Sequence, residues 1–278
     1  MRRVFGKAIP SGYFVTIIVV LAVPAIAQDK KEATFKVAPR PIVSITNNYG
    51  PITVTGSGDQ QVVVTSESRS ASVKFENEQH GNRIQLRVVS STPGDNLAEY
   101  MVVVPSDAWV TVRSSGAPTR AEKLRGDVYI EAVIGPVTVS EMHDAHIHLR
   151  SLEAPITLTR IHSCQIDVNS LSGDVILRDV TESLTSVHAG GGRILFEGDP
   201  GTNGDYDLTS NTGDLDVSIP AKAVVDIKPR SLQGDLSAEA LTNPSGEGGQ
   251  HFVPKSKLSA ASVFVLRSFR GKIHVKRP

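Results

Sequence analysis

The chain has 278 residues, of which 40% are hydrophobic, 21% are charged and only 5% are aromatic. Such a composition can bury a core of small aliphatic side chains, and the scarcity of aromatic residues favours a thin fold. The 29 basic and 29 acidic residues cancel, which argues against nucleic acid as a partner. The single cysteine excludes an internal disulfide and a zinc site made of several thiolates.

Residues 1–27 have the order of a secretory signal peptide. Three basic residues, Arg2, Arg3 and Lys7, precede the apolar run YFVTIIVVLAV, and small residues end the segment at Ala27. We therefore predict cleavage after Ala27, no transmembrane span in the mature chain, and a periplasmic or secreted location at the cell envelope. The alternative is a leader retained as a membrane anchor, because residues 8–27 are almost long enough to span a bilayer, although Pro10, Ser11, Gly12 and Pro24 interrupt that segment.

The part that follows the leader contains strand-like segments with irregular spacing. They are rich in valine, isoleucine and leucine, and the clearest lie at 61–65, 72–75, 83–87 and 101–104. We expect these segments to form hairpins.

From residue 135 onward, a turn followed by a short strand recurs six times. The second residues of these units are spaced by 19, 19, 19, 21 and 21 residues, and similar units open at Gly50 and Gly126. Each unit begins with Gly or Ala followed by a turn residue, namely Pro136, Pro155, Asp174, Arg193, Asp214 and Asp235.

A second alternating segment lies between successive units, so each repeat holds two short strands. Alternation places one apolar row inward and one polar row outward. Two strands and two turns close one flattened coil, and stacked coils would pair equivalent strands in parallel about 4.8 Å apart. The sequence therefore predicts an all-β fold, a parallel β-solenoid with two short strands per coil of about 19 residues.

The predicted core consists of two inward rows, one from each strand of the coil. The expected rows are Val137, Ile156, Val175, Ile194, Leu215 and Leu236 on one sheet, and Ile147, Ile166, Thr185, Tyr206 and Val225 on the other.

This pattern divides the chain into three parts. Residues 1–27 are the signal peptide, and 28–115 are an N-terminal β part that caps and starts the solenoid, because an open end would expose strand edges. Residues 116–278 form the coils, with a Pro/Gly/Ser-rich surface loop at 242–258. Strands at 262–265 and 272–275 would then close the solenoid.

The opening PIVSITNNYGPITVTG, the units GDVILRDV and TGDLDVSI, and the leader resemble the bacterial adhesin-like family known as domain of unknown function 4097. The resemblance covers nearly the whole mature chain. It implies a β-solenoid at or outside the cell envelope, and it supplies no catalytic motif.

The histidines are the sharpest chemical feature. His146 and His148 should project outward on one face, with Asp167 one coil above His148, so the three side chains are a weak candidate site for zinc or copper. The simpler interpretation is an exposed histidine–aspartate ladder. His143 and His162 also lie one coil apart at a corner, as a stacked imidazole pair or as two exposed turn residues.

Two other features have simple interpretations. The run from Asp199 to Asp207 carries carboxylates that suggest calcium, but it lacks the closing glutamate of an EF-hand and is more simply the insertion that lengthens one repeat. Cys164 should lie on the inward row with Ala145, as a buried and inert thiol. No nucleotide loop, nucleophile elbow or zincin motif occurs, so we expect no cofactor.

One outward row suggests a contact surface. Ile176 and Leu195 should be apolar neighbours on a face that meets water, with Arg178 and Glu197 pairing beside them. This patch is a candidate for binding another protein or a loop of this chain. Isolated apolar surface residues are also common and need no function.

Together these observations predict an exported, non-catalytic binding or scaffolding protein of the envelope, similar to adhesins. Its partner would be a protein or a cell-surface glycan, and self-association stays open. The alternative is a carbohydrate-active enzyme on a β-helix scaffold. A deep groove with converging carboxylates would favour the enzyme, and a flat ladder surface would favour binding.

Overall fold

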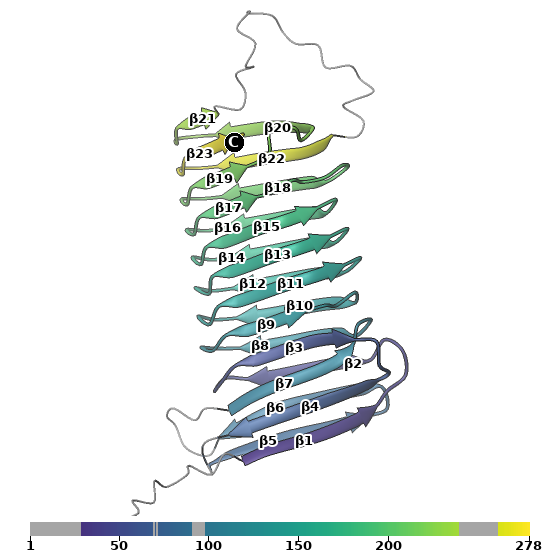
Figure 1. The fold of residues 1–278 in the computed structure, drawn as a ribbon. Helices are drawn as coiled ribbons and strands as arrows, with labels where there is room; N and C mark the ends of the chain where they lie inside the picture. Colours follow the sequence, from purple (N-terminus) through teal and green to yellow (C-terminus); the bar gives the residue numbers. More distant parts are fainter. Residues whose placement is uncertain (1–28, 69, 71, 91–97, 239–260) are drawn as a thin grey trace, which may run out of the picture.

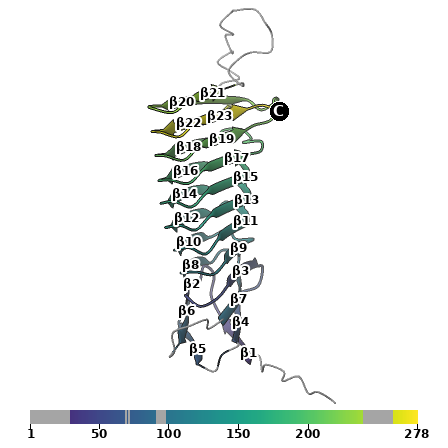
Figure 2. The same ribbon diagram turned by 90° about the vertical axis from the view of Figure 1, so that its left-hand side faces the viewer.

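The computed structural model describes residues 29–68, 70, 72–90, 98–238 and 261–278. The predicted signal peptide with its cleavage site after Ala27, and the predicted loop at 242–258, lie outside the described residues. Within the described parts the chain forms 23 strands and no helix. The strands belong to two sheets that face each other as thin layers, and the coils are stacked from the N-terminal to the C-terminal end (Figures 1 and 2).

The first sheet has 12 strands, most of them parallel. In spatial order they are β1 (Asp29–Lys36), β4 (Gln61–Ser68), β7 (Ala98–Pro105), β3 (Ile52–Ser57), β9 (Thr119–Glu122), β11 (Val137–His143), β13 (Ile156–His162), β15 (Val175–Thr181), β17 (Ile194–Glu197), β19 (Leu215–Ser218), β23 (Ile273–Lys276) and β21 (Leu236–Ala238).

The second sheet has 11 strands. In spatial order they are β20 (Val225–Ser231), β22 (Ser262–Ser268), β18 (Asp205–Ser210), β16 (Leu184–Ala189), β14 (Gln165–Ser170), β12 (His146–Ser151), β10 (Asp127–Ala132), β8 (Trp109–Ser114), β2 (Ile42–Asn47), β6 (Arg83–Ser90) and β5 (Val73–His80).

The middle coils confirm the predicted solenoid. β11, β13, β15 and β17 pair in parallel, and Val137, Ile156, Val175 and Ile194 occupy equivalent positions. β12 and β14 pair in the same way on the other sheet. The alternation of buried and partly exposed residues along each strand places the apolar row inside, as its period of two requires.

The core is one continuous stack of aliphatic side chains between the two sheets. Larger side chains enter it towards the C-terminal end, where Phe196, Tyr206 and Phe264 form a cluster with ring centroids 4.5–5.1 Å apart. All three rings are fully buried. Aromatic contacts of this kind add about 0.5–1.5 kcal/mol beyond the area that they bury.

At the N-terminal end, antiparallel strands cover the coils, but only β5 and β6 form one of the predicted hairpins. β4 pairs antiparallel with β1 and β7, and β5 pairs antiparallel with β6. The first coil, β2 and β3, does not lie at the end. It is placed between β8 and β9 on one side and β6 and β7 on the other.

The C-terminal end corrects the prediction that 262–265 and 272–275 close the solenoid. β22 and β23 instead lie one layer inside, between β18 and β19 below and β20 and β21 above. Ile273 therefore separates Leu215 from Leu236 in the inward row, where direct neighbours were expected.

Two register expectations are also wrong. On the second sheet, Phe264 follows Tyr206 in the inward row, and Ile227 rather than Val225 lies opposite Phe264. The unit at Gly126 opens β10 on the second sheet, so it is not the predecessor of the unit at Gly135. In both cases the alternation of apolar and polar residues predicts a strand correctly, but it does not indicate which neighbouring strand that strand pairs with.

The corner that leads into the first sheet is built from close backbone contacts. A methyl group on Gly192 would lie 2.2 Å from the carbonyl oxygen of Gly173 in the coil below, so only glycine fits there. In each of two such turns, a serine hydroxyl stabilises the backbone by donating a hydrogen bond to the carbonyl three residues later. Ser170 donates to the Gly173 carbonyl at 2.7 Å, and Ser151 donates to the Ala154 carbonyl at 2.6 Å.

A candidate ligand hollow and a candidate docking patch

The opposite corner, which follows the strands of the first sheet, turns through residues with a positive φ. Non-glycine residues rarely adopt this conformation, and here they produce the turn, with one in the coil of Lys123 and two in each of the next three coils. They form two columns: Lys123, Glu141, Arg160 and Asp179 in one, and Asp144, Ser163 and Glu182 in the other.

Charges of opposite sign alternate along the first of these columns. Arg160 donates a hydrogen bond to Glu141 at 2.7 Å, and Arg125 donates one to Asp144 at 3.2 Å. The hydrogen bond from Arg160 holds the pKa of Glu141 below its usual range, and the charge of Lys123 adds to this effect. Glu141 is therefore ionised at neutral pH. These groups are solvent-exposed, so the pairs order the surface more than they stabilise the fold.

A hollow of about 460 Å³ opens at this corner because one coil is a residue short. Thr119 pairs with Val137, and Asp127 pairs with His146. The path from the first sheet to the second therefore takes eight residue steps from Thr119 to Asp127, but nine residue steps from Val137 to His146 in the next coil. The missing position would lie next to His143 in the preceding coil, and the hollow occupies this place.

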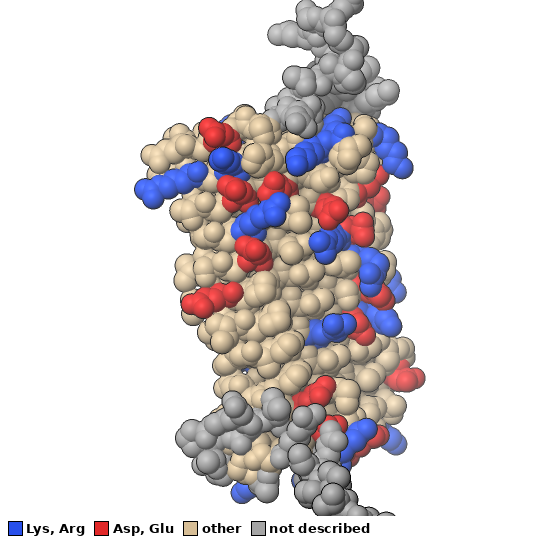
Figure 3. Space-filling model, turned by 60° about the vertical axis from the view of Figure 1, so that its left-hand side comes forward, with Lys and Arg blue, Asp and Glu red and all other residues tan. Residues whose placement is uncertain are grey.

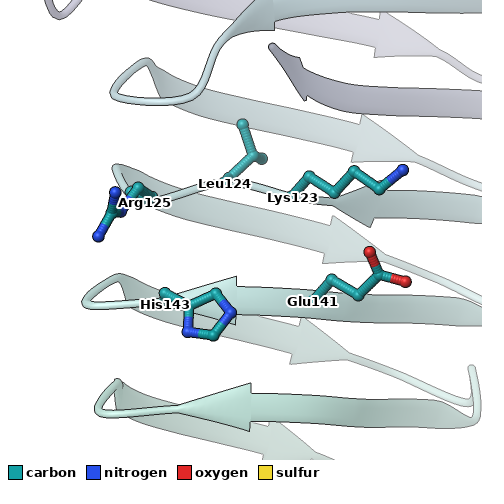
Figure 4. Close-up of a pocket in the computed structure, with 5 residues that line it drawn as sticks. All are labelled: Lys123, Leu124, Arg125, Glu141 and His143. Atoms are coloured by element: carbon teal, nitrogen blue, oxygen red, sulfur yellow. The ribbon is translucent and has the colours of Figure 1, made fainter. Parts of the chain in front are cut away.

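Five residues from two successive coils line this corner hollow: Lys123, Leu124, Arg125, Glu141 and His143. Figure 4 shows Arg125 and His143 near the turn, and Lys123 and Glu141 further along the strands. Leu124 borders the hollow from below its surface, because its side chain is fully buried. The hollow falls within the range of about 300–1,000 Å³ typical of small-molecule sites, and it offers three donors and one carboxylate acceptor.

The predicted contact residues lie together on the outer face of the first sheet. Ile176 is paired in register with Leu195, and Arg178 lies opposite Glu197 with a distance of 3.2 Å between Nε and Oε2. Both apolar side chains are half-buried. We refer to these four residues as the docking patch. They combine an apolar centre with a charged margin, which is typical of contact surfaces.

A second hollow, of about 290 Å³, extends the docking patch towards the C-terminal coils. Leu195 and Glu197 are shared with it, and Arg193, which forms an ion pair of 2.6 Å with Asp216, adds to its wall. The hydrogen bond to Asp216 raises the pKa of Arg193, so this guanidinium is always charged. Sequence reasoning missed this extension because Lys276 and His274 enter the sheet out of chain order.

A further groove of about 390 Å³ runs along the glycine corner. Its polar side chains come from successive coils, with Arg150, Asn169 and His188 in one column and Leu171 as an apolar edge. Gly190 contributes no side chain, which leaves the space open.

The histidines do not gather into one site. His146 contacts Asp127 at 2.9 Å, and His148 contacts Asp167 at 3.3 Å while stacking on Tyr129. The two imidazoles thus reach carboxylates on opposite sides of β12. No group of three or more His, Cys, Asp or Glu side chains suited to a metal ion occurs among the described residues.

At the corner, His143 and His162 do approach each other, with ring centroids 5.8 Å apart in an edge-to-face arrangement. His162 also contacts the hydroxyl of Thr181 at 2.8 Å. In the run from Asp199 to Asp207, Asp199 accepts a hydrogen bond from the Gly201 amide and Asp207 pairs with Arg267.

Cys164 is buried on the inward row, as predicted. It accepts a hydrogen bond from the Ala145 amide at 3.4 Å, and burial raises the pKa of its thiol. A thiol held in this way is a poor nucleophile.

One small hollow contains two carboxylates that bear on the enzyme alternative. Glu76 and Glu78 line a space of about 80 Å³ on β5 and β6, together with Arg87 and Gln85. This volume is far below the range of about 300–1,000 Å³ typical of substrate pockets. Glu197 and Asp216 both line the hollow of about 290 Å³ beside the docking patch, but each of these carboxylates is paired with an arginine. Charged side chains lie in such mixed groups on the visible face, beside a broad uncharged area over the middle coils (Figure 3).

The fold and these surfaces define a class of protein: a two-sheet β-solenoid whose middle coils present a regular outer face. The family model Toastrack DUF4097 matches residues 42–276, and the chain belongs to this family. None of the curated proteins compared with the chain matches it. No helix among the described residues is long and apolar enough to cross a membrane.

Two solved structures are similar in outline. A proposed cell adhesion protein from Clostridium sporogenes ATCC 15579 is 12% identical, with 90% of this chain and 100% of that chain covered and a TM-score of 0.27. A proposed adhesin from Parabacteroides distasonis ATCC 8503 is 9% identical, with 89% and 97% covered and the same TM-score. These values are too low for the likeness to bear on function.

Proposed function

We propose that the chain is an exported, non-catalytic binding or scaffolding module of the cell envelope, with an adhesin-like role. The observation that carries this proposal is the docking patch. Ile176 and Leu195 form an apolar pair on a face of parallel strands, and the ion pair of Arg178 with Glu197 borders it. The partner is a protein, because aliphatic side chains complement the apolar centre of a protein surface better than they complement a polar glycan.

Export is part of the same proposal. The leader has the basic, apolar and small-residue order that signal peptidases recognise, which supports a mature chain beginning at Gln28 in the periplasm or outside the cell. A binding module of the envelope requires such a location.

The test measures the binding of the chain, isolated from its host, to host envelope preparations. Mass spectrometry of the isolated chain first shows whether that chain begins at Gln28. Replacing both Ile176 and Leu195 by serine should weaken binding by at least about 100-fold, because burying each aliphatic side chain in a contact contributes about 1.5–3 kcal/mol. The matched control replaces Thr138 and Thr157, which lie in the same outward row, by serine and should bind like the native chain.

Treatment of the envelope distinguishes the partner classes. Protease treatment should abolish the binding that depends on Ile176 and Leu195, whereas loss of that binding after glycosidase treatment alone would contradict a protein partner. Undiminished binding by the double serine variant would overturn the role of the docking patch. Release of reducing sugar from envelope glycans by the native chain would overturn the non-catalytic assignment.

A further inference from the structure

We propose that the corner hollow is a binding site for a carboxylate-bearing sugar, such as a uronic acid, free or as a residue of a glycan. The hollow is lined by Lys123, Leu124, Arg125, Glu141 and His143 and lies on a corner, away from the docking patch. The site does not depend on the proposed docking function.

The space is a property of the backbone. The coil from Thr119 to Asp127 is one residue shorter than the coil from Val137 to His146, although both are paired in register. The missing residue, and not a particular side-chain rotamer, therefore accounts for the open position at this corner.

The charges of the hollow favour an anion. Arg125 uses one terminal nitrogen to reach Asp144 at 3.2 Å, which leaves its other donors directed to solvent. Among the described residues, Lys123 forms no ion pair within 4.0 Å. His143 lies beside Arg125 at the turn (Figure 4), so donors gather at that end. A carboxylate there would accept charge-assisted hydrogen bonds.

Glu141 limits which anions fit. Its side chain is ionised because Arg160 donates a hydrogen bond of 2.7 Å to it, so it accepts hydrogen bonds and repels a second negative charge. A ligand therefore needs hydroxyl donors at the end where Glu141 and Lys123 lie. A ring with a single carboxylate and several hydroxyls satisfies both requirements.

The test is calorimetric titration of the whole chain with glucuronate, glucose and inorganic phosphate. Glucuronate should bind at least about ten-fold more tightly than either of the others, because glucose lacks the carboxylate and phosphate lacks the hydroxyls and the ring. Equal affinity for glucuronate and glucose would overturn the role of the cations. Equal affinity for glucuronate and phosphate would overturn the assignment to a sugar.

Variants locate the site. Arg125→Gln should weaken glucuronate binding about ten-fold, since it removes a charged donor, while Arg178→Gln on the docking patch is the matched control and should have no effect. Insertion of one alanine after Leu124 restores the longer coil, keeps every charge and should abolish binding. Unchanged glucuronate affinity in Arg125→Gln would overturn the proposal even if the insertion variant failed to fold.

A uronate-containing oligosaccharide distinguishes the two sources of the ligand. Tighter binding of the oligosaccharide than of free glucuronate indicates a glycan residue, and the reverse indicates a soluble acid. Arg125→Gln should leave envelope binding through the docking patch unchanged. A failure of the sugar site and a failure of the docking patch can therefore be distinguished.

Discussion

At the scale of single residues, neighbouring positions on one strand have opposite roles. Ile166 is 1% exposed and lies between Ile147 and Thr185 in the inward row, whereas Asp167 points outward and contacts His148 at 3.3 Å. The alternation of β14 alone separates the core from the surface.

This alternation gives a direct prediction. Ile166→Asp should unfold the solenoid, or lower its free energy of unfolding by more than about 4 kcal/mol, because a charge would be buried without a partner. Asp167→Asn should change it by less than about 0.5 kcal/mol, since exposed pairs contribute little. Urea denaturation followed by circular dichroism measures both. Equal shifts in the two variants would contradict the assigned faces.

At the scale of the coil, the glycine corner depends on the approach of backbones between adjacent layers. A side chain on Gly192 would collide with the Gly173 carbonyl, but one on its neighbour Gly191 would meet nothing closer than 3.6 Å. Two adjacent glycines therefore differ sharply in the space around them.

We expect Gly192→Ala to destabilise the protein by about 1–3 kcal/mol or more, because the stacked backbones must separate. Gly191→Ala, the matched control, should be neutral or stabilising by up to about 1 kcal/mol through the unfolded chain. Thermal unfolding of the two variants beside the native chain is the measurement. A loss of stability in Gly191→Ala as large as in Gly192→Ala would show that the corner is not specified by close stacking.

The coils of the middle part could be predicted from the sequence because every coil repeats the same spacing of turn and strand. From Val137 to Phe196 the inward and outward rows agree with the sequence pattern, including the neighbours Ile176 and Leu195. The corner hollow was missed because its signal is one absent residue. The Ala117-Pro118 turn lies 18 residues before the Gly135-Pro136 turn, where the repeat has 19. The similar unit at Gly126 obscures this difference in spacing.

At the scale of the whole molecule, the two ends are built alike, and the sequence could not predict either. β2 and β3 are enclosed by strands from later in the chain, and β22 and β23 are enclosed by strands from earlier in the chain. Parallel pairing between short apolar strands has no local signal for which partner is chosen, because the connecting segments do not fix the register.

The enclosed C-terminal pair supports a prediction about the entire fold. A chain that ends at Ala261 loses β22 and β23, including Phe264, and leaves the rings of Phe196 and Tyr206 without a layer above them. It should bind a dye specific for exposed apolar surface and melt at a lower temperature. A chain that lacks only the last two residues is the control. Native melting of the shorter chain would contradict the placement of β22.

The position of β22 and β23 also sets an order in time. Among the strands that the structure describes, β20 pairs only with β22, and β21 pairs only with β23. During synthesis the segment 225–238 leaves the ribosome before its partners do. Its native pairing must therefore wait until β22 and β23, which both lie later in the chain, have been made.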